Sequence, residues 1–117
     1  MRNLMRLRSR KYSAAEIEDL VSKGLATIRG HSDPIKIYLF GSALGENFDD
    51  FSDLDFLLVF QTKEQAVRSR QLLYRQSHAF SHPVDFICVD NETFEQKAEI
   101  GGVYLIAKQD GRLLYSK

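Results

Sequence analysis

The chain has 117 residues, a length that suits one domain with its own core and is too short for two. Its hydrophobic content of 44% is ordinary for a globular protein, and no apolar run approaches the roughly 20 residues that a membrane helix needs. The formal net charge is zero, and the one cysteine, Cys88, excludes an internal disulfide, so we expect a cytoplasmic protein in which Cys88 is a small buried apolar residue.

The charge is unevenly distributed along the chain. The first eleven residues carry five positive charges and no negative ones, whereas the remainder has 11 basic against 16 acidic residues, a net charge of −5. A basic N-terminal segment of this kind is either frayed and solvated, or it contacts nucleic acid or an acidic partner. The acidic remainder of the chain argues against a nucleic-acid-binding face on the folded part. We therefore expect a flexible basic arm over residues 1–12, which lacks the apolar core of a secretory signal, and a domain over residues 13–117.

The first predicted element is a helix that begins after Ser13. Ser13 and Glu16 have the spacing of a capping box, and the residues that follow place one apolar side chain after another on a single helical face. These residues are Ile17, Leu20, Val21, Leu25 and Ile28. Gly30 stands where a C-terminal glycine cap is expected, so the helix is predicted to end there.

The rest of the chain alternates between predicted strands and helices. Thr62 and Gln65 make a second capping box, and Asp110-Gly111 is a turn signal. The expected order is a strand over residues 35–40, a short helical turn after Gly41-Ser42, a strand over 53–60, a helix from 62 to about 79, a strand over 84–89, a helix from about 92 that is interrupted at 101–102 and resumes at 103–106, and an edge strand at 112–115. This order predicts an α/β domain with a mixed sheet.

Two carboxylates stand at the start of the most hydrophobic predicted strand. Residues two apart on a strand point to the same face, so Asp53 and Asp55 are expected to project together and to repel each other. A divalent cation would offset that repulsion, and paired carboxylates together with substrate phosphates suit Mg²⁺. The alternative is that both aspartates lie in solvent at the beginning of the strand, where one of them caps the preceding turn.

Two further features favour a site over an exposed strand start. Gly41-Ser42 follows a strand directly and opens a helical turn, where a glycine lets a phosphate approach the backbone and N–H groups can bind it. Asp85 is a lone acid between Val84 and Phe86. If the strands over 53–60 and 84–89 are neighbours, three carboxylates converge beside the turn, an arrangement typical of metal-assisted nucleotidyl transfer.

These residues resemble the signature of the minimal nucleotidyltransferases of the DNA polymerase β superfamily. The shared features are Gly41-Ser42, ten intervening residues, Asp53-Leu54-Asp55 within SDLDFLLV, and Asp85 within VDFICV. The likeness spans about residues 13 to 115 and implies a polymerase β-like fold, a small mixed sheet flanked by helices. The chain departs from the pattern after the turn, because relatives often carry a basic residue where this sequence has Ala43-Leu44-Gly45.

The resemblance implies a role for each of these positions. Gly41 and Ser42 would hold the triphosphate of ATP, Asp53 and Asp55 would bind Mg²⁺, with two ions expected, and Asp85 would ligate the catalytic metal or act as general base. Lys63, Arg68 or Arg75 would then supply positive charge for the phosphates, although Arg68 and Arg75 also fit a solvated helix face. His78 and His82 lack a third metal ligand at suitable spacing, and we interpret both as structural or surface residues.

The resemblance also implies a partner. Antibiotic-modifying relatives carry an additional helical domain for which this chain has no room, so the acceptor surface would come from a partner or from a second copy in a homo-oligomer. Stand-alone domains of this kind resemble the antitoxins of toxin–antitoxin pairs, which silence a helical HEPN-class ribonuclease toxin by transferring AMP to a tyrosine. The alternatives are a non-catalytic antitoxin or nucleotide-binding module that acts by contact, and nucleotidyl transfer to a small molecule such as an aminoglycoside.

Overall fold

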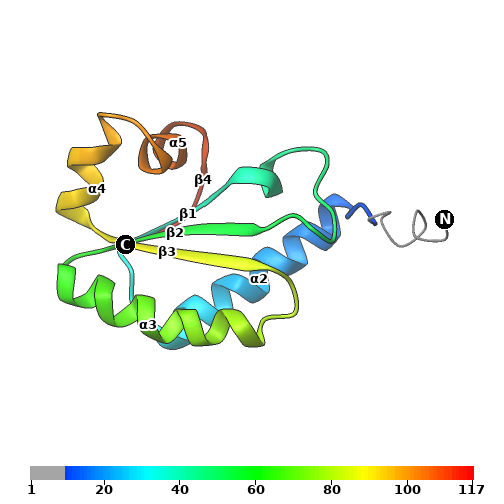
Figure 1. Cartoon of the computed structure of the whole chain (residues 1–117), viewed down its shortest axis with the longest axis horizontal. Helices are drawn as coiled ribbons and strands as arrows, with labels where there is room; N and C mark the ends of the chain where they lie inside the picture. Colours follow the sequence, from blue (N-terminus) through cyan, green and yellow to red (C-terminus); the bar gives the residue numbers. More distant parts are fainter. Residues whose placement is uncertain (1–9) are drawn as a thin grey trace, which may run out of the picture.

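The computed structural model describes residues 10–117 as an open four-stranded sheet with helices on both faces (Figure 1). The elements are α2 (Ala14–His31), β1 (Lys36–Phe40), the 3₁₀ turn η1 (Gly41–Leu44), β2 (Leu54–Phe60), α3 (Lys63–Ala79), β3 (Val84–Asp90), α4 (Asn91–Ala98), α5 (Val103–Asp110) and β4 (Arg112–Ser116). The α/β class and the expected order of the elements are confirmed. Within residues 10–117 no helix is both long enough and apolar enough to cross a membrane.

Helix α2 begins as predicted and ends later than predicted. Its capping box is formed in both directions, since Ser13 Oγ accepts from the Glu16 N–H at 3.1 Å and a Glu16 carboxylate oxygen accepts from the Ser13 N–H at 2.8 Å. The predicted cap at Gly30 is wrong, because Gly30 lies inside the helix and is not among the positive-φ glycines. Ser32 ends the helix instead, with its N–H and its hydroxyl both donating to the Ile28 carbonyl.

The sheet has the strand order β3-β2-β1-β4. The two central strands, β1 and β2, are antiparallel, β4 is antiparallel to β1, and β3 is parallel to β2, so the mixed sheet predicted from the sequence is confirmed. The register of the parallel pair places Leu54 opposite Val84 and Asp55 opposite Asp85. Strands β2 and β3 therefore begin at the same end of the sheet, beside the end of β1.

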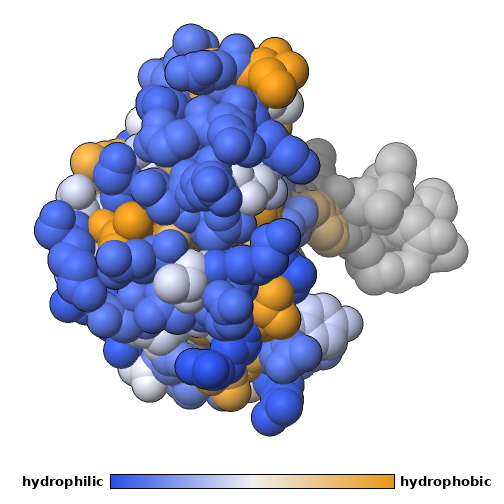
Figure 2. Space-filling model, turned by 90° about the vertical axis from the view of Figure 1, so that its left-hand side faces the viewer, coloured by the Kyte–Doolittle hydropathy of each residue, from blue (hydrophilic) through white to orange (hydrophobic). Residues whose placement is uncertain are grey.

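The sheet separates two hydrophobic clusters. Helices α2 and α3 cover one face, and α4 and α5 cover the end of the other face at which β2 finishes (Figure 1). The first cluster includes Ile28, Phe56, Leu58, Leu73 and Cys88, and the second includes Tyr38, Leu57, Val59, Phe94 and Ala107. Burial raises the pKa of the Cys88 thiol to about 12, which agrees with the prediction of a small buried residue. The outer surface at the α4 end is mostly hydrophilic with separate hydrophobic side chains (Figure 2).

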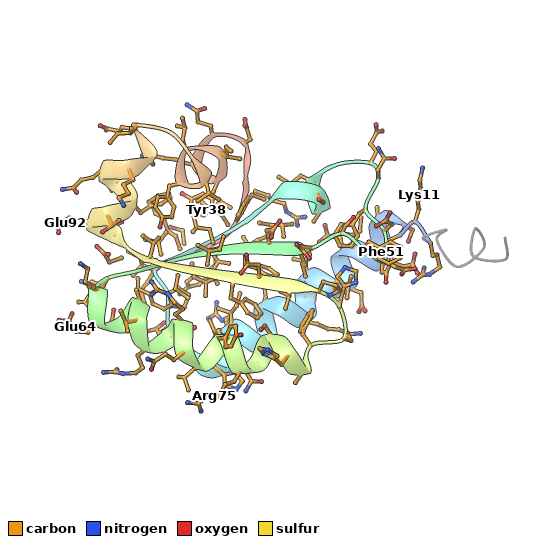
Figure 3. All side chains as sticks on the ribbon, in the orientation of Figure 1. Lys11, Tyr38, Phe51, Glu64, Arg75 and Glu92 are labelled. Carbon is orange, nitrogen blue, oxygen red and sulfur yellow. The ribbon has the colours of Figure 1, made fainter. Side chains whose placement is uncertain are left out.

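The segment that precedes α2 contacts the loop between η1 and β2. The Tyr12 N–H donates to the Phe48 carbonyl at 2.9 Å, and the Arg10 N–H donates to the Asp50 carboxylate at 3.1 Å. Lys11 lies at the same end of the molecule as Phe51 of this loop (Figure 3). Residues 1–9 of the predicted arm lie outside the described residues, so the boundary between arm and domain stays a prediction.

Gly24 sets how closely α2 approaches β2. A Cβ atom at Gly24 would lie 2.4 Å from Cζ of Phe56, a ring that is fully buried in the core. We expect Gly24→Ala to lower the free energy of unfolding by about 1–3 kcal/mol, the usual range for overpacking, although alanine is the better helix former.

Gly30 provides the matched control in the same helix, because a Cβ at Gly30 would meet nothing within 4 Å. Gly30→Ala is expected to raise the stability by up to about 1 kcal/mol. Urea unfolding of both variants measures the difference, and equal effects of the two substitutions would contradict the close contact between α2 and Phe56.

Candidate active site

Asp55 lies where three strands meet. It is the second residue of β2, it faces Phe40 at the end of β1, and it faces Asp85 near the start of β3. Alternation along β2 puts Asp55 on the same face as Leu57 and Val59, which belong to the cluster beneath α4 and α5. The two helices cover the opposite end of that face, whereas η1 lies at the end that carries the acid (Figure 1).

Asp53 and Asp85 join Asp55 at this end of the sheet. Asp53 is one residue ahead of β2 rather than within it, and its side chain is exposed. Asp85 is exposed on the edge strand β3, and the same alternation places it on the face of Ile87 and Val89. The expectation that β2 and β3 are neighbours is confirmed, and the pairing sets two of the three predicted carboxylates side by side.

Gly41 brings the turn after β1 directly against Asp55. Its φ of +79° lies in the left-handed region, which a side chain disfavours, and a Cβ at this position would lie only 2.5 Å from Oδ2 of Asp55. Ser42 follows in η1 with an exposed side chain whose hydroxyl forms no hydrogen bond to another part of residues 10–117. The turn thus presents backbone and a hydroxyl group beside a carboxylate, with glycine required for the close approach.

The three acids interact unfavourably. Burial, followed by the negative charges of Asp53 and Asp85, raises the pKa of the Asp55 carboxyl to about 6. The ion pairs formed within residues 10–117 all involve other carboxylates, so no lysine or arginine of the described chain is paired with any of the three. The arrangement concentrates negative charge that no described cation neutralises.

The three carboxylates suit a hard cation such as Mg²⁺ only when another molecule supplies further ligands to that cation. Within the described residues no group of three or more aspartate, glutamate, histidine and cysteine side chains is arranged to hold a metal ion. Mg²⁺ needs only one or two carboxylates when substrate phosphates complete its coordination. Asp53 and Asp55 fit that requirement: burial, and then the charges of Asp53 and Asp85, raise the pKa of Asp55, and a bound cation would offset both the burial of that charge and the repulsion.

The lysine and arginines proposed from the sequence to balance phosphate charge lie elsewhere. All three are on α3, which packs against the face of the sheet opposite to Asp55. Lys63 follows the far end of β2, roughly 16 Å along the strand from Asp55 at about 3.3 Å per residue. Arg68 is exposed, and Arg75 points away from the sheet on the outer side of α3 (Figure 3). Arg68 and Arg75 therefore belong to a solvated face of α3, and none of the three side chains lies at the acid cluster.

The two histidines differ in their surroundings. His78 is exposed near the end of α3, whereas His82 is 5% exposed, stacks on Phe48 with ring centroids 5.1 Å apart, and has Nε2 2.7 Å from the Ser52 carbonyl oxygen. Ser52 immediately precedes Asp53. Sequence reasoning missed this contact because it joins residues 30 positions apart, and only the position of His82 just before a predicted strand hinted at it.

The raised pKa of Asp55 predicts a pH dependence of stability. The folded state holds the Asp55 proton more tightly than the unfolded chain, so folding stability falls as pH rises from about 4 to 6. Asp55→Asn removes this loss. In metal-free buffer the variant should match the parent near pH 4 and be more stable by about 1–3 kcal/mol at pH 7, at about 1.4 kcal/mol for each tenfold change in proton affinity.

Asp85→Asn is the control for this measurement, because Asp85 is exposed and contributes less than burial does to the raised pKa of Asp55. Urea unfolding at several pH values measures all three proteins. Parallel stability curves for the parent and Asp55→Asn would show that the pKa of Asp55 is not raised by folding.

The sequence model of the family described as "Polymerase beta, Nucleotidyltransferase" matches residues 23–116, which include the Gly41-Ser42 turn and all three aspartates. No curated protein and no solved structure matches the chain. A match over most of the chain, from the middle of α2 to the end of β4, shows that the chain belongs to the polymerase β family of nucleotidyltransferases.

Proposed function

We propose that this chain transfers AMP from ATP to a hydroxyl group of a protein partner, in a reaction that depends on Mg²⁺. The observation that carries the proposal is the uncompensated cluster of Asp53, Asp55 and Asp85 at one end of the sheet, against the Gly41 turn. Membership of the nucleotidyltransferase family supports the class of reaction. The nucleotide, the metal and the protein acceptor are parts of the proposal.

The reaction assigns a task to each group. The acceptor oxygen attacks the α-phosphorus of ATP, the bond from that phosphorus to the bridging oxygen of the β-phosphate breaks, and pyrophosphate leaves. Asp85 receives the hydroxyl proton or completes the cation site, and its exposure leaves it accessible to an acceptor. The backbone at Gly41 and the Ser42 hydroxyl hold the triphosphate. Asp53 and Asp55 hold Mg²⁺, which when bound neutralises charge on the phosphates.

A groove beside Asp85 offers space for the acceptor. It has a volume of about 430 Å³ and follows the outer edge of β3, which is the last strand of the sheet on that side. Its lining combines Arg70, Tyr74 and Ser77 of α3 with Tyr104 of α5 and the outer part of β3, including Asp85. An acceptor segment in this groove would bring a hydroxyl group next to Asp85.

We further propose a helical HEPN-class ribonuclease toxin as the partner, which would make the chain an antitoxin. This choice rests on the resemblance to stand-alone nucleotidyltransferases of toxin–antitoxin pairs, and on the exposed position of Asp85 beside the groove, where a partner can approach. The product of the neighbouring open reading frame is the partner to test first.

The metal-binding role predicts that Asp53→Asn together with Asp55→Asn abolishes transfer of labelled AMP to the partner. The fold should survive, since the substitutions remove charge repulsion. Asp33→Asn is the matched control: Asp33 lies at the opposite end of the sheet in an exposed pair with Lys117, and such pairs contribute little. Unchanged transfer by the double variant would end the catalytic interpretation of this pair.

Asp85→Asn separates an enzyme from an antitoxin that acts by contact. The substitution keeps the size of the side chain, so binding of the partner should persist while transfer falls by about 10²-fold or more, the usual contribution of a positioned base. Mass spectrometry should find one added adenylyl group per transfer with the parent chain and none with the variant. If the variant still silences the partner as well as the parent does, silencing is by contact and the enzyme proposal fails.

A further inference from the structure

His82 is a buried polar side chain close to the acid cluster but outside it. Among residues 10–117 only Ser69 and His82 are both polar and buried, and His82 is 5% exposed. Burying an imidazole is unfavourable unless its N–H groups are hydrogen-bonded. Its Nε2 atom lies 2.7 Å from the Ser52 carbonyl oxygen, which can only accept, so Nε2 carries a hydrogen and donates it.

The dipeptide His82-Pro83 holds the backbone on both sides of Asp53. On one side, the Ser52 carbonyl accepts the hydrogen bond from His82. On the other side, the Leu54 N–H donates to the Pro83 carbonyl at 2.9 Å. The Asp53 side chain is exposed and forms no ion pair within the described residues, so its position depends on the backbone bonds of its neighbours. Ser52 is also bonded to Asp49, through its N–H and its hydroxyl, and the two bonds from His82-Pro83 tie this turn to the start of β3.

The same dipeptide leads directly into the strand that carries Asp85. Val84 begins β3 opposite Leu54, and Asp85 pairs with Asp55 one position further. A bond from His82 to Ser52 therefore ties the segment before β2 to the segment before β3. This bond links the backbone beside Asp53, which lies outside the strands, to the strands whose register fixes Asp55 and Asp85.

Aromatic rings fix the direction in which the imidazole points. Phe48 stacks on it at 5.1 Å between ring centroids, and Tyr12 meets it edge-on at 5.4 Å. Tyr12 and Phe48 also pack edge to face at 5.5 Å, so the three rings form one cluster. A phenyl ring would fill this place without the cost of burying nitrogen, which leaves the donated hydrogen bond as the property that only a polar ring supplies.

We propose that His82 is a positioning residue that holds Asp53 in place relative to Asp55 and Asp85. The inference rests on the proposed function, since the positions of these acids matter only if they share a cation or a substrate. Removing a group that orients a metal ligand typically weakens metal affinity or activity about 10- to 100-fold. His82 itself touches neither metal nor substrate in this assignment.

The test compares His82→Phe, which keeps a ring and loses the donor, with His82→Gln, whose amide nitrogen reaches about as far as Nε2. His78→Phe is the control for the substitution itself, because His78 is exposed. The first readout is amide hydrogen exchange at Asp53 and Leu54 by NMR, which needs neither metal nor transfer. The second is the dissociation constant of Mn²⁺ in the presence of a non-hydrolysable ATP analogue.

We expect His82→Phe to accelerate exchange at Leu54 and to weaken Mn²⁺ binding by about tenfold or more, and His82→Gln to restore most of both. His78→Phe should leave both at the parent values. Parent-like exchange and Mn²⁺ affinity in His82→Phe would overturn the inference, as would a folded His82→Gln that behaves like His82→Phe.

Two further results have defined meanings. If His82→Phe does not fold, His82→Asn replaces it, because the shorter amide cannot reach Ser52, and equal behaviour of the Asn and Gln variants would overturn the inference. If the parent itself binds no Mn²⁺ and transfers no AMP, the proposed function fails, while exchange at Leu54 still decides whether His82 holds the backbone around Asp53.

Discussion

The parallel pairing of β2 with β3 is the constraint on which the acid cluster depends. Its register sets Asp55 directly opposite Asp85, and the antiparallel pairing with β1 sets the same carboxylate opposite Phe40, immediately before the Gly41 turn. A sheet cannot slip by one residue without moving every side chain to the other face, so the buried residues on both faces of β2 hold this arrangement in place. The stability of two hydrophobic clusters thereby keeps like charges together, and burial raises the pKa of Asp55 to about 6.

Two close approaches extend this constraint to the rest of the domain. Gly24 lets α2 lie against the ring of Phe56, which supports β2 from beneath, and Gly41 lets the turn after β1 lie against the carboxylate of Asp55 above. The loop that leads into β2 is fixed separately, by the rings of Tyr12, Phe48 and His82 and by the hydrogen bond to Ser52. The site thus combines a rigid part set by strand register with a loop whose geometry depends on a few side-chain contacts.

The sequence predicted the features that local patterns encode. Both capping boxes, the apolar run of β2 and the glycines that interrupt the last helical segment lie within a few residues of the structure they specify, and the elements follow them. Gly30 misled the prediction because a glycine can also continue a helix, and the hydrogen bonds of Ser32 decided where α2 ends. The sequence could not place Arg75 on a particular face of the fold, nor could it show that His82 reaches Ser52, because both depend on contacts between distant segments.

We propose that the three aspartates and the Gly41 turn form one site for a nucleoside triphosphate and its metal. A crystal structure of the chain with Mn²⁺ and a non-hydrolysable ATP analogue tests it most directly, because the anomalous signal of Mn²⁺ locates the ion without reference to the protein atoms. We expect Mn²⁺ at the carboxylates of Asp53 and Asp55, with the triphosphate against Gly41 and Ser42. Mn²⁺ and triphosphate bound together elsewhere on the molecule, with these aspartates free of both, would contradict it.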